Sequence, residues 1–534
     1  MRKIDSLGVM IDMSRNAVMS IEGLKRYMPL LSKMGYNKIF LYTEDTYEVN
    51  GQPYFGYMRG RYSKEEMKEL DKLALSYGIE VIPCIQTLAH LSAINRWNQY
   101  PMDSIDILMA DDEKTYELID KMFETLNECF STRRLHVGMD EAHDLGRGKH
   151  LDKYGYETVD VIMKRHLAKI VELANKYNYE LMIWSDMYFR PWNNGVYSVP
   201  KQKVPQEYID ALPETVIPVY WDYYSKEEQN YNDMIENHKQ LSKRTWFAGG
   251  VWTWGGFLPH NKFSLETMIP ALNQMRKHGI TQVFMTLWGD NGAECSRFSA
   301  LPALFYLSQY AKGVTDEAKI KAKFERMFGI SYDDFMLLDI PNDFRPGVKD
   351  SKVPNNPSKY MLYNDYFLGH LDYTVGEGGC EYFAECESKL LAVAKKSRKY
   401  GYLFDNAAKL SGVLKYKYDL GVKTRRAYKA GDKEELRRLA NNEYVAISKA
   451  LTAFIKAFEK QWMLENKPYG FEVQEIRLGG LMKRTESCRR RLLDYADGKI
   501  DAIPELSEEI LPYGEEGRSI YNNLYKNNVT SNVM

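Results

Sequence analysis

The stretch LGVMIDMSRNAVMSIEGLKRYMPLLSKMGYNKIFLY, residues 7–42, contains a short apolar run, a longer amphipathic segment and a second apolar run. The runs Leu7–Ile11 and Lys38–Tyr42 are rich in branched and aromatic residues, which is typical of strands buried on both faces. Between them, Ile21–Met34 has apolar residues at helical spacing and precedes Gly35, a residue type that commonly ends a helix. The stretch therefore predicts a strand, a helix and a second strand parallel to the first.

The same alternation continues to about residue 311. Six further apolar runs predict strands, over Glu80–Cys84, Leu135–Gly138, Glu180–Trp184, Val216–Tyr220, Thr245–Ala248 and Gln282–Leu287. The segments between and after them predict helices over Lys64–Tyr77, Lys114–Phe130, Asp160–Tyr177, Lys226–Leu241, Leu265–His278 and Leu301–Ala311. Eight strands that alternate with helices are the number that closes a barrel, so we predict the α/β class and a (β/α)8 TIM barrel.

The composition changes after residue 312. Eight of the nine tryptophans precede this point, and the remainder is rich in Lys, Glu, Leu, Ala and Tyr. Helical spacing recurs in Glu381–Tyr400, Lys433–Lys460 and Leu478–Asp497, whereas Lys349–Tyr360 predicts a loop and Asn527–Met534 a frayed tail. We predict a barrel domain over residues 1–312 and a mainly α-helical C-terminal domain over residues 313–534. The dense stretch from Gln461 to Leu481 is expected to pack against the barrel or a second subunit, with a contribution to the site's rim as the alternative.

Charge and composition narrow the function classes. The chain has 534 residues with 72 basic and 73 acidic side chains, and it contains no basic block. We therefore expect neither nucleic acid nor a membrane as a partner. The N-terminus lacks a signal-peptide pattern and no run of about 20 apolar residues occurs, which predicts a cytoplasmic protein. The six cysteines are scattered without CxxC pairs, so they predict reduced thiols rather than disulfides or a zinc site.

The residues that follow each predicted strand are the first candidates for function, because barrel active sites form at the carboxyl ends of the strands. They are mostly carboxylates and indoles: Asp12, Arg15, Glu44, Asp45, Gln86, His90, His136, Asp140, Glu141, Trp184, Asp186, Tyr220, Trp221, Asp222, Trp252, Trp254, Trp288, Asp290 and Glu294. Indole faces stack on sugar rings, and carboxylates and arginine bind hydroxyls. The set favours a carbohydrate ligand, whereas the surplus of carboxylates and the absence of a glycine-rich cradle disfavour phosphate.

The run Leu135-His-Val-Gly-Met-Asp-Glu141 is the most distinctive local motif. It resembles the His-x-Gly-x-Asp-Glu signature of glycoside hydrolase family 20, the β-N-acetylhexosaminidases, at the end of barrel strand 4. The likeness extends over about residues 7–295, through the segments that end in Arg15, His90, Tyr220-Trp-Asp222 and Trp288-Gly-Asp290. The stretch Leu41-Tyr-Thr-Glu-Asp45 departs from the family pattern. The closer resemblance is to the branch that includes hexosaminidase D and streptococcal exo-hexosaminidases with a helical C-terminal domain.

This resemblance implies substrate-assisted hydrolysis of terminal β-linked GlcNAc or GalNAc through an oxazolinium intermediate, with retention and without a cofactor. It assigns Glu141 as general acid and then base, Asp140 to the acetamido N–H and Tyr220 to its carbonyl oxygen. The remaining implied binding residues are Arg15, His90, His136, Trp184, Asp222, Trp252, Trp254, Trp288, Asp290 and Glu294. Two choices stay open: Trp252 or Trp254 in the wall, and Asp290 or Glu294 on the 4- and 6-hydroxyls.

Other interpretations stay beside this one. His136, His143 and His150 recur every seven residues, but this spacing does not predict a metal site. A noncatalytic carbohydrate-binding protein with a degenerate barrel is the alternative function, and an O-GlcNAc-removing enzyme with an Asp-Asp pair is disfavoured by Glu141. The sequence leaves open the choice between GlcNAc and GalNAc, the natural glycan, the role of the helical domain, and whether the protein is a homodimer.

Overall fold

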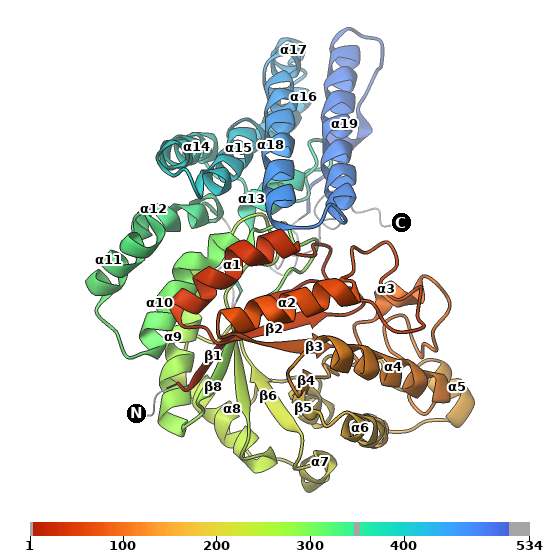
Figure 1. Ribbon diagram of the computed structural model, residues 1–534. Helices are drawn as coiled ribbons and strands as arrows, with labels where there is room; N and C mark the ends of the chain where they lie inside the picture. The colour runs from red at the N-terminus through yellow and green to blue at the C-terminus, as the bar shows by residue number, and fades with distance from the viewer. Residues whose placement is uncertain (1–3, 347–352, 512–534) are drawn as a thin grey trace.

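The barrel predicted from the sequence is present in the structure, a computed structural model that describes residues 4–346 and 353–511. Eight parallel strands form one closed sheet in chain order, and β1 pairs with both β2 and β8 (Figure 1). The strands are β1 (Ser6–Asp12), β2 (Lys38–Thr43), β3 (Glu80–Ile85), β4 (Arg134–His136), β5 (Glu180–Trp184), β6 (Ile217–Trp221), β7 (Trp246–Gly250) and β8 (Gln282–Leu287). Each starts and ends within one or two residues of its predicted bounds.

Helices surround the sheet and follow the predicted order. The helices of this part are α1 (Ile21–Met34), α2 (Lys64–Ser76), α3 (Ser92–Asn95), α4 (Glu113–Cys129), α5 (Lys149–Tyr154), α6 (Val159–Lys176), α7 (Gln206–Ala211), α8 (Glu228–Leu241), α9 (Asn261–His278) and α10 (Leu301–Ala311). Local signals set their ends: the Ser20 side chain accepts the Gly23 amide at the start of α1, and Gly35 ends α1 in the left-handed conformation.

Strand residues alternate between the inside of the barrel and the layer beneath the helices. The inner cluster takes every second residue, including Met10, Phe40, Met182, Val219 and Phe284. The residues between them belong to the larger core between sheet and helices. The same alternation continues for a few residues beyond the strand ends, so every second residue there points towards the pocket.

The chain after α10 is helical, as the sequence predicted. It contains α11 (Glu317–Phe328), α12 (Tyr332–Met336), α13 (Pro357–Tyr363), α14 (Gly379–Lys396), α15 (Gly401–Lys417), α16 (Leu420–Lys429), α17 (Lys433–Asn441), α18 (Glu443–Glu465), α19 (Phe471–Ala496) and α20 (Pro504–Ser507). Short 3-10 turns occur in both parts of the chain. Before α10 they are η1 (Asp186–Tyr188), η2 (Arg190–Trp192) and η3 (Arg297–Ala300), and after it they are η4 (Leu337–Asn342) and η5 (Asp372–Thr374). The predicted helical segment Lys433–Lys460 is divided at Asn442, and α19 starts seven residues before its predicted start at Leu478.

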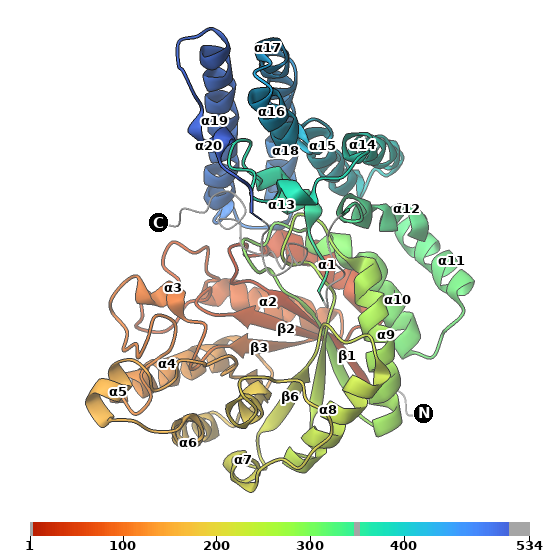
Figure 2. The same cartoon turned by 180° about the vertical axis from the view of Figure 1, so that it is seen from behind.

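The helical region lies against one side of the barrel, where α18 ends and α19 begins near α1 (Figures 1 and 2). The Ser20 amide donates to the carbonyl of Glu465 at 3.0 Å, and Lys467 donates its amide to Val18 at 2.8 Å. The stretch from Gln461 to Leu481 therefore packs against the barrel, one of its two predicted positions. The boundary at residue 312 stays a prediction. The predicted tail Asn527–Met534 and part of the predicted loop Lys349–Tyr360 lie outside the described residues, and Pro357–Tyr360 of that loop belong to α13.

All six cysteines are unpaired, which agrees with the predicted reduced thiols. Among the described residues, no helix combines the length and apolar character needed to cross a membrane.

Candidate active site

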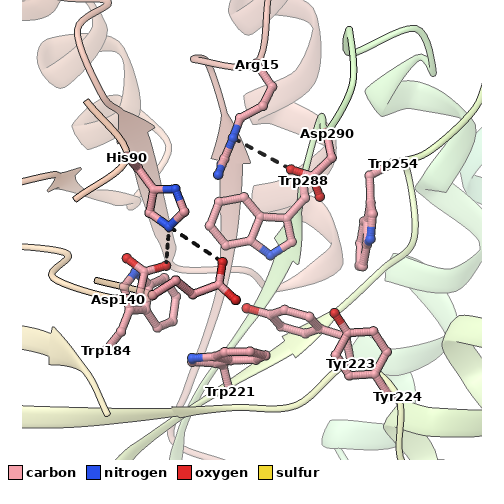
Figure 3. A pocket seen from close by; sticks show the side chains of 11 residues that line it. Arg15, His90, Asp140, Trp184, Trp221, Tyr223, Tyr224, Trp254, Trp288 and Asp290 are labelled. Carbon is pink, nitrogen blue, oxygen red and sulfur yellow. Dashed lines mark ion pairs between the residues drawn. The ribbon is translucent and has the colours of Figure 1, made fainter. Parts of the chain in front are cut away.

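One pocket opens at the carboxyl ends of the strands (Figure 3). Its volume is about 480 Å³, mouth included, which suits one small ligand. Eight of the residues that the family resemblance assigned to the site line it: Arg15, His90, Asp140, Glu141, Trp184, Trp254, Trp288 and Asp290. Trp221, Tyr223 and Tyr224 complete the lining.

The turn after β4 presents both adjacent carboxylates to the pocket. Gly138, Met139 and Glu141 all have left-handed φ angles, of 73°, 69° and 51°. A Cβ at Gly138 would lie 2.1 Å from Oε1 of Gln86, so the turn requires glycine there. Because the backbone leaves the extended conformation, Asp140 and Glu141 escape the strand rule that would point them to opposite sides. Left-handed non-glycine residues are strained, and such strain is typical of functional sites.

Asp140 is held as a carboxylate beside a charged histidine. Its Oδ1 accepts a hydrogen bond from Nε2 of Gln86 at 2.7 Å, and its Oδ2 lies 3.3 Å from Nε2 of His90. Burial opposes ionisation, but the His90 charge and these contacts lower the pKa of Asp140 to about 2. Burial also disfavours a charged imidazole, but the nearby Asp140 carboxylate raises the pKa of His90 to about 9. At neutral pH the pair is an anion beside a cation.

Glu141 has a different environment. Its side chain is 41% exposed, and its carboxylate lies 3.3 Å from Nη2 of Arg190 and 3.7 Å from Nε2 of His90. Asp186 accepts both the Glu141 amide and Nε of Arg190 at 3.0 Å. Burial raises the pKa of Asp186 to about 7, with the Asp140 charge adding to the effect and Arg190 opposing it. Arg190 and Asp186 therefore hold the backbone and the side chain of Glu141 together.

Arg15 lies in another part of the pocket from Asp140 and Glu141, and it is surrounded by acidic side chains. It lies 3.3 Å from carboxylate oxygens of Asp12 and Glu44, and 3.6 Å from Asp290. Its guanidinium also lies 4.9 Å from the ring centres of Tyr42 and Trp288. A guanidinium held in this way points its remaining donors at the pocket, where a ligand hydroxyl can accept them.

The indoles form the walls and their support. His136 lies beneath Trp184, with ring centres 4.4 Å apart, and burial lowers the pKa of His136 to about 3. Trp252 stacks on Trp254 at 3.9 Å but does not line the pocket. The structure therefore places Trp254 in the wall and Trp252 behind it, where Nε1 of Trp252 donates to the carbonyl of Tyr223 at 3.0 Å.

Tyr220 does not face the pocket, contrary to the sequence prediction. Its ring packs outside the barrel against His238, 4.7 Å away, and Phe247, 5.3 Å away. Its hydroxyl donates to Asp222 at 3.3 Å. The physical reason is the strand alternation: Val219 and Tyr223 are inward positions of β6 and its extension, and Tyr220 is an outward one. Tyr223 lines the pocket in its place.

Two predicted acids also lie outside the pocket. Asp222 is buried and accepts the amides of Tyr224 and Ser225, so it shapes the turn after β6. The Glu294 side chain is 1% exposed and pairs with Lys359 at 2.7 Å and Arg477 at 3.1 Å. Of the two alternatives for sugar hydroxyls, only Asp290 lines the pocket.

Several residues that line the pocket or contact its side chains had no predicted role. The strand-end rule returned Glu44, Gln86, Asp186 and Trp221 without assigning them one. Tyr223 and Tyr224 lie just beyond the residues considered after β6. Extending the alternation of inward and outward side chains past Trp221 would have identified Tyr223. Arg190 lies on a 3-10 turn, and we know of no sequence signal that places it beside Glu141.

Two groups in the described chain have ligand atoms close enough for a metal ion, and in both of them the carboxylates already pair with basic side chains. The first is His90 with Asp140 and Glu141, where His90 pairs with Asp140 at 3.3 Å and Arg190 pairs with Glu141 at 3.3 Å. The second is Asp111, His150 and Glu157, where the Arg165 guanidinium already pairs with Asp111 at 2.6 Å and with Glu157 at 2.7 Å. The absence of a metal stays a prediction.

A (β/α)8 barrel with adjacent carboxylates in an indole-walled pocket is the arrangement of a glycoside hydrolase. The model for the glycosyl hydrolase family 20 catalytic domain matches residues 7–239, and the model for the Glycoside Hydrolase 20C C-terminal domain matches residues 333–523. The chain belongs to glycoside hydrolase family 20, which confirms the resemblance carried by residues 136–141.

The chain is also similar to curated and solved proteins. Hexosaminidase D of Bos taurus is 22% identical over 265 residues, which are 48% of this chain and 72% of that protein. Hexosaminidase D of Homo sapiens is 23% identical over 222 residues, 39% of this chain and 43% of that protein. A solved GH20 exo β-N-acetylglucosaminidase from Vibrio harveyi, in complex with N-acetylglucosamine, is 15% identical with a TM-score of 0.47, covering 63% of this chain and 59% of that chain.

Proposed function

We propose that this protein is an exo-acting, retaining β-N-acetylhexosaminidase that releases terminal GlcNAc or GalNAc from glycans. The observation that carries the proposal is the contrast between Asp140 and Glu141. Asp140 is buried and held as an anion, whereas Glu141 is partly exposed in the same pocket. Adjacent carboxyl groups in contrasting environments serve different chemical roles.

The contrast suits substrate-assisted hydrolysis. The acetamido oxygen of the substrate attacks the anomeric carbon while the bond to the leaving oxygen breaks, and Glu141 donates a proton to that oxygen. Asp140 accepts a hydrogen bond from the acetamido N–H and stabilises the positive charge of the oxazolinium ion. Water then attacks the same carbon and loses a proton to Glu141, while the bond between that carbon and the acetamido oxygen breaks; this restores the acetamido group and retains the configuration. Positioned intramolecular attack removes several kcal/mol from the barrier.

Tyr223 takes the role that the sequence assigned to Tyr220. Its side chain lines the pocket, and burial raises its pKa well above the ordinary value, so the hydroxyl keeps its proton at neutral pH. A protonated hydroxyl can donate to the acetamido carbonyl oxygen and orient it for attack. Arg15 and Asp290 bind ring hydroxyls, and Trp184, Trp254 and Trp288 enclose the sugar.

The test compares an aryl N-acetyl-β-D-glucosaminide and the matching galactosaminide with the aryl β-D-glucoside that lacks the acetamido group. We expect cleavage of an acetamido sugar only, and loss of most activity in Glu141→Gln. Asp140→Asn should also be impaired, because a neutral amide cannot stabilise the oxazolinium charge.

Cleavage of the glucoside at an equal rate would refute assistance by the acetamido group. Binding of N-acetylglucosamine without cleavage of any of these substrates would favour the carbohydrate-binding alternative. Tryptophan fluorescence reports that binding, because indoles line the pocket.

A further inference from the structure

The loop after β8 carries Asp290 and has an unusual backbone. Asn291, Gly292 and Ala293 follow with φ angles of 60°, 123° and 51°, all in the left-handed region. Two of these three residues have side chains, for which this conformation is strained. Such a loop keeps its shape only when its surroundings hold it.

The helical C-terminal region supplies most of the contacts that hold this loop. Nη1 of Arg477 donates to the Asn291 carbonyl at 2.8 Å, and Nε2 of Gln474 donates to the Gly292 carbonyl at 3.0 Å. Both residues lie on α19. The packing is close, because a Cβ at Gly292 would lie 2.5 Å from Nη1 of Arg477.

Glu294 fastens the far end of the loop. Its buried carboxylate pairs with Arg477 of α19 and with Lys359 of α13, whose side chain is fully buried. Lys359 also donates to the Asn291 carbonyl at 3.4 Å. A buried carboxylate with two cationic partners is costly to disturb, since loss of one partner leaves charge uncompensated. The loop is therefore fixed to two helices that are far apart in sequence.

We propose that the helical region is a working part of the sugar pocket: Arg477, Gln474 and Lys359 position Asp290 by fixing residues 289–294. These three are positioning residues, since none of them lines the pocket. Asp290 is the residue that they position, and its carboxylate lies 3.6 Å from Nε of Arg15 within the pocket. The ligand in this proposal rests on the proposed function, whereas the fixing of the loop does not.

The first experiment measures the loop directly in the full-length protein by amide hydrogen exchange. Arg477→Gln and Gln474→Ala should both increase exchange at residues 289–294, and Arg477→Lys should restore part of the protection. Arg484→Gln is the matched control, because Arg484 lies two turns further along α19 and pairs with Asp365 at 2.6 Å inside the helical region. It should leave the loop unchanged. Unchanged exchange in both test variants would overturn the proposal.

The second experiment asks whether the effect reaches the sugar through Asp290. Arg477→Gln should lower kcat/KM for the aryl N-acetyl-β-D-glucosaminide about tenfold, and this loss should largely disappear in an Asp290→Ala background. Equal losses with and without the Asp290 side chain would show that Arg477 does not act through it, and would refute the proposal. If the wild type cleaves no substrate, the proposed function fails. Two measurements then still decide whether Arg477 positions Asp290: amide hydrogen exchange at residues 289–294, and the affinity of each variant for N-acetylglucosamine.

Discussion

Replacing Tyr223 by phenylalanine should slow the reaction strongly without unfolding the protein. The hydroxyl is the only group removed, and the ring keeps its contacts with Trp221 at 5.3 Å and Trp254 at 5.7 Å. If this hydroxyl binds the acetamido oxygen as that oxygen attacks, its loss costs about 3 kcal/mol of transition-state stabilisation, or about 10²-fold in kcat. The expected change in KM is smaller.

Tyr220→Phe is the matched control, since it removes the same atom three residues earlier. The lost contact is the 3.3 Å bond to Asp222, which keeps its bonds from the Tyr224 amide at 2.9 Å and the Ser225 hydroxyl at 2.7 Å. We expect a loss of about 1 kcal/mol in the free energy of unfolding and little change in kcat.

The assay measures kcat, KM and the unfolding free energy for both variants with an aryl N-acetyl-β-D-glucosaminide. A large loss of kcat in Tyr220→Phe, with Tyr223→Phe close to wild type, would refute the reasoning from strand alternation. Equal losses in both variants would refute it as well.

Two further predictions concern stability and pH. Folded His90 has a pKa of about 9, above the usual 6.5, so its stabilising pair with Asp140 is fully present below pH 6.5 and lost as the pH rises to about 9. The melting temperature should therefore decline over this pH range, and His90→Gln should reduce the decline. An unchanged decline in the variant would contradict the assignment. Burial raises the pKa of Glu465 to about 7 although Ser296 and Tyr402 donate hydrogen bonds to it, so the folded state holds a proton that the unfolded chain releases near pH 4.5. Stability should fall between pH 4.5 and 7, and Glu465→Gln should flatten this fall; an identical slope in both proteins would count against it.

The barrel could be predicted because its signal is local and repeated. Strands covered on both faces read as continuous apolar runs, and the stretch Glu180–Trp184 was predicted with its observed bounds. The division between α17 and α18 was not predicted, because Asn442 interrupts the helix without a glycine or proline to mark it. Helical spacing continues on both sides of it.

The Asp140–Glu141 pair could be predicted because its motif is compact. Predicting the residues around it requires knowing in which direction each side chain points from its strand. Tyr220 and Tyr223 are equally plausible as residue types, and only the alternation along β6 separates them. Trp252 and Trp254 share one side of the chain, so their order relative to the pocket depended on packing.

The choice between Asp290 and Glu294 could not be made from local sequence. Glu294 is removed from the pocket by Lys359 and Arg477, which lie 65 and 183 residues further along the chain. Arg190 beside Glu141 is a similar case, since its position depends on two successive 3-10 turns. Long-range partners of this kind leave no pattern near the residue that they move.

The pairing of β1 with β8 has a consequence for synthesis of the chain. The Gly289 amide donates to Asp12 across 277 residues, and at translation rates of about 5–20 residues per second this separation takes on the order of tens of seconds. Until then, the first strand emerges from the ribosome with one edge unpaired, a surface that invites association with other chains. Chaperones that protect the nascent N-terminal half should therefore raise the yield of folded protein, without changing the stability of the protein once it has folded. The loop after β8 gains its contacts with Gln474 and Arg477 later still, when α19 has been made.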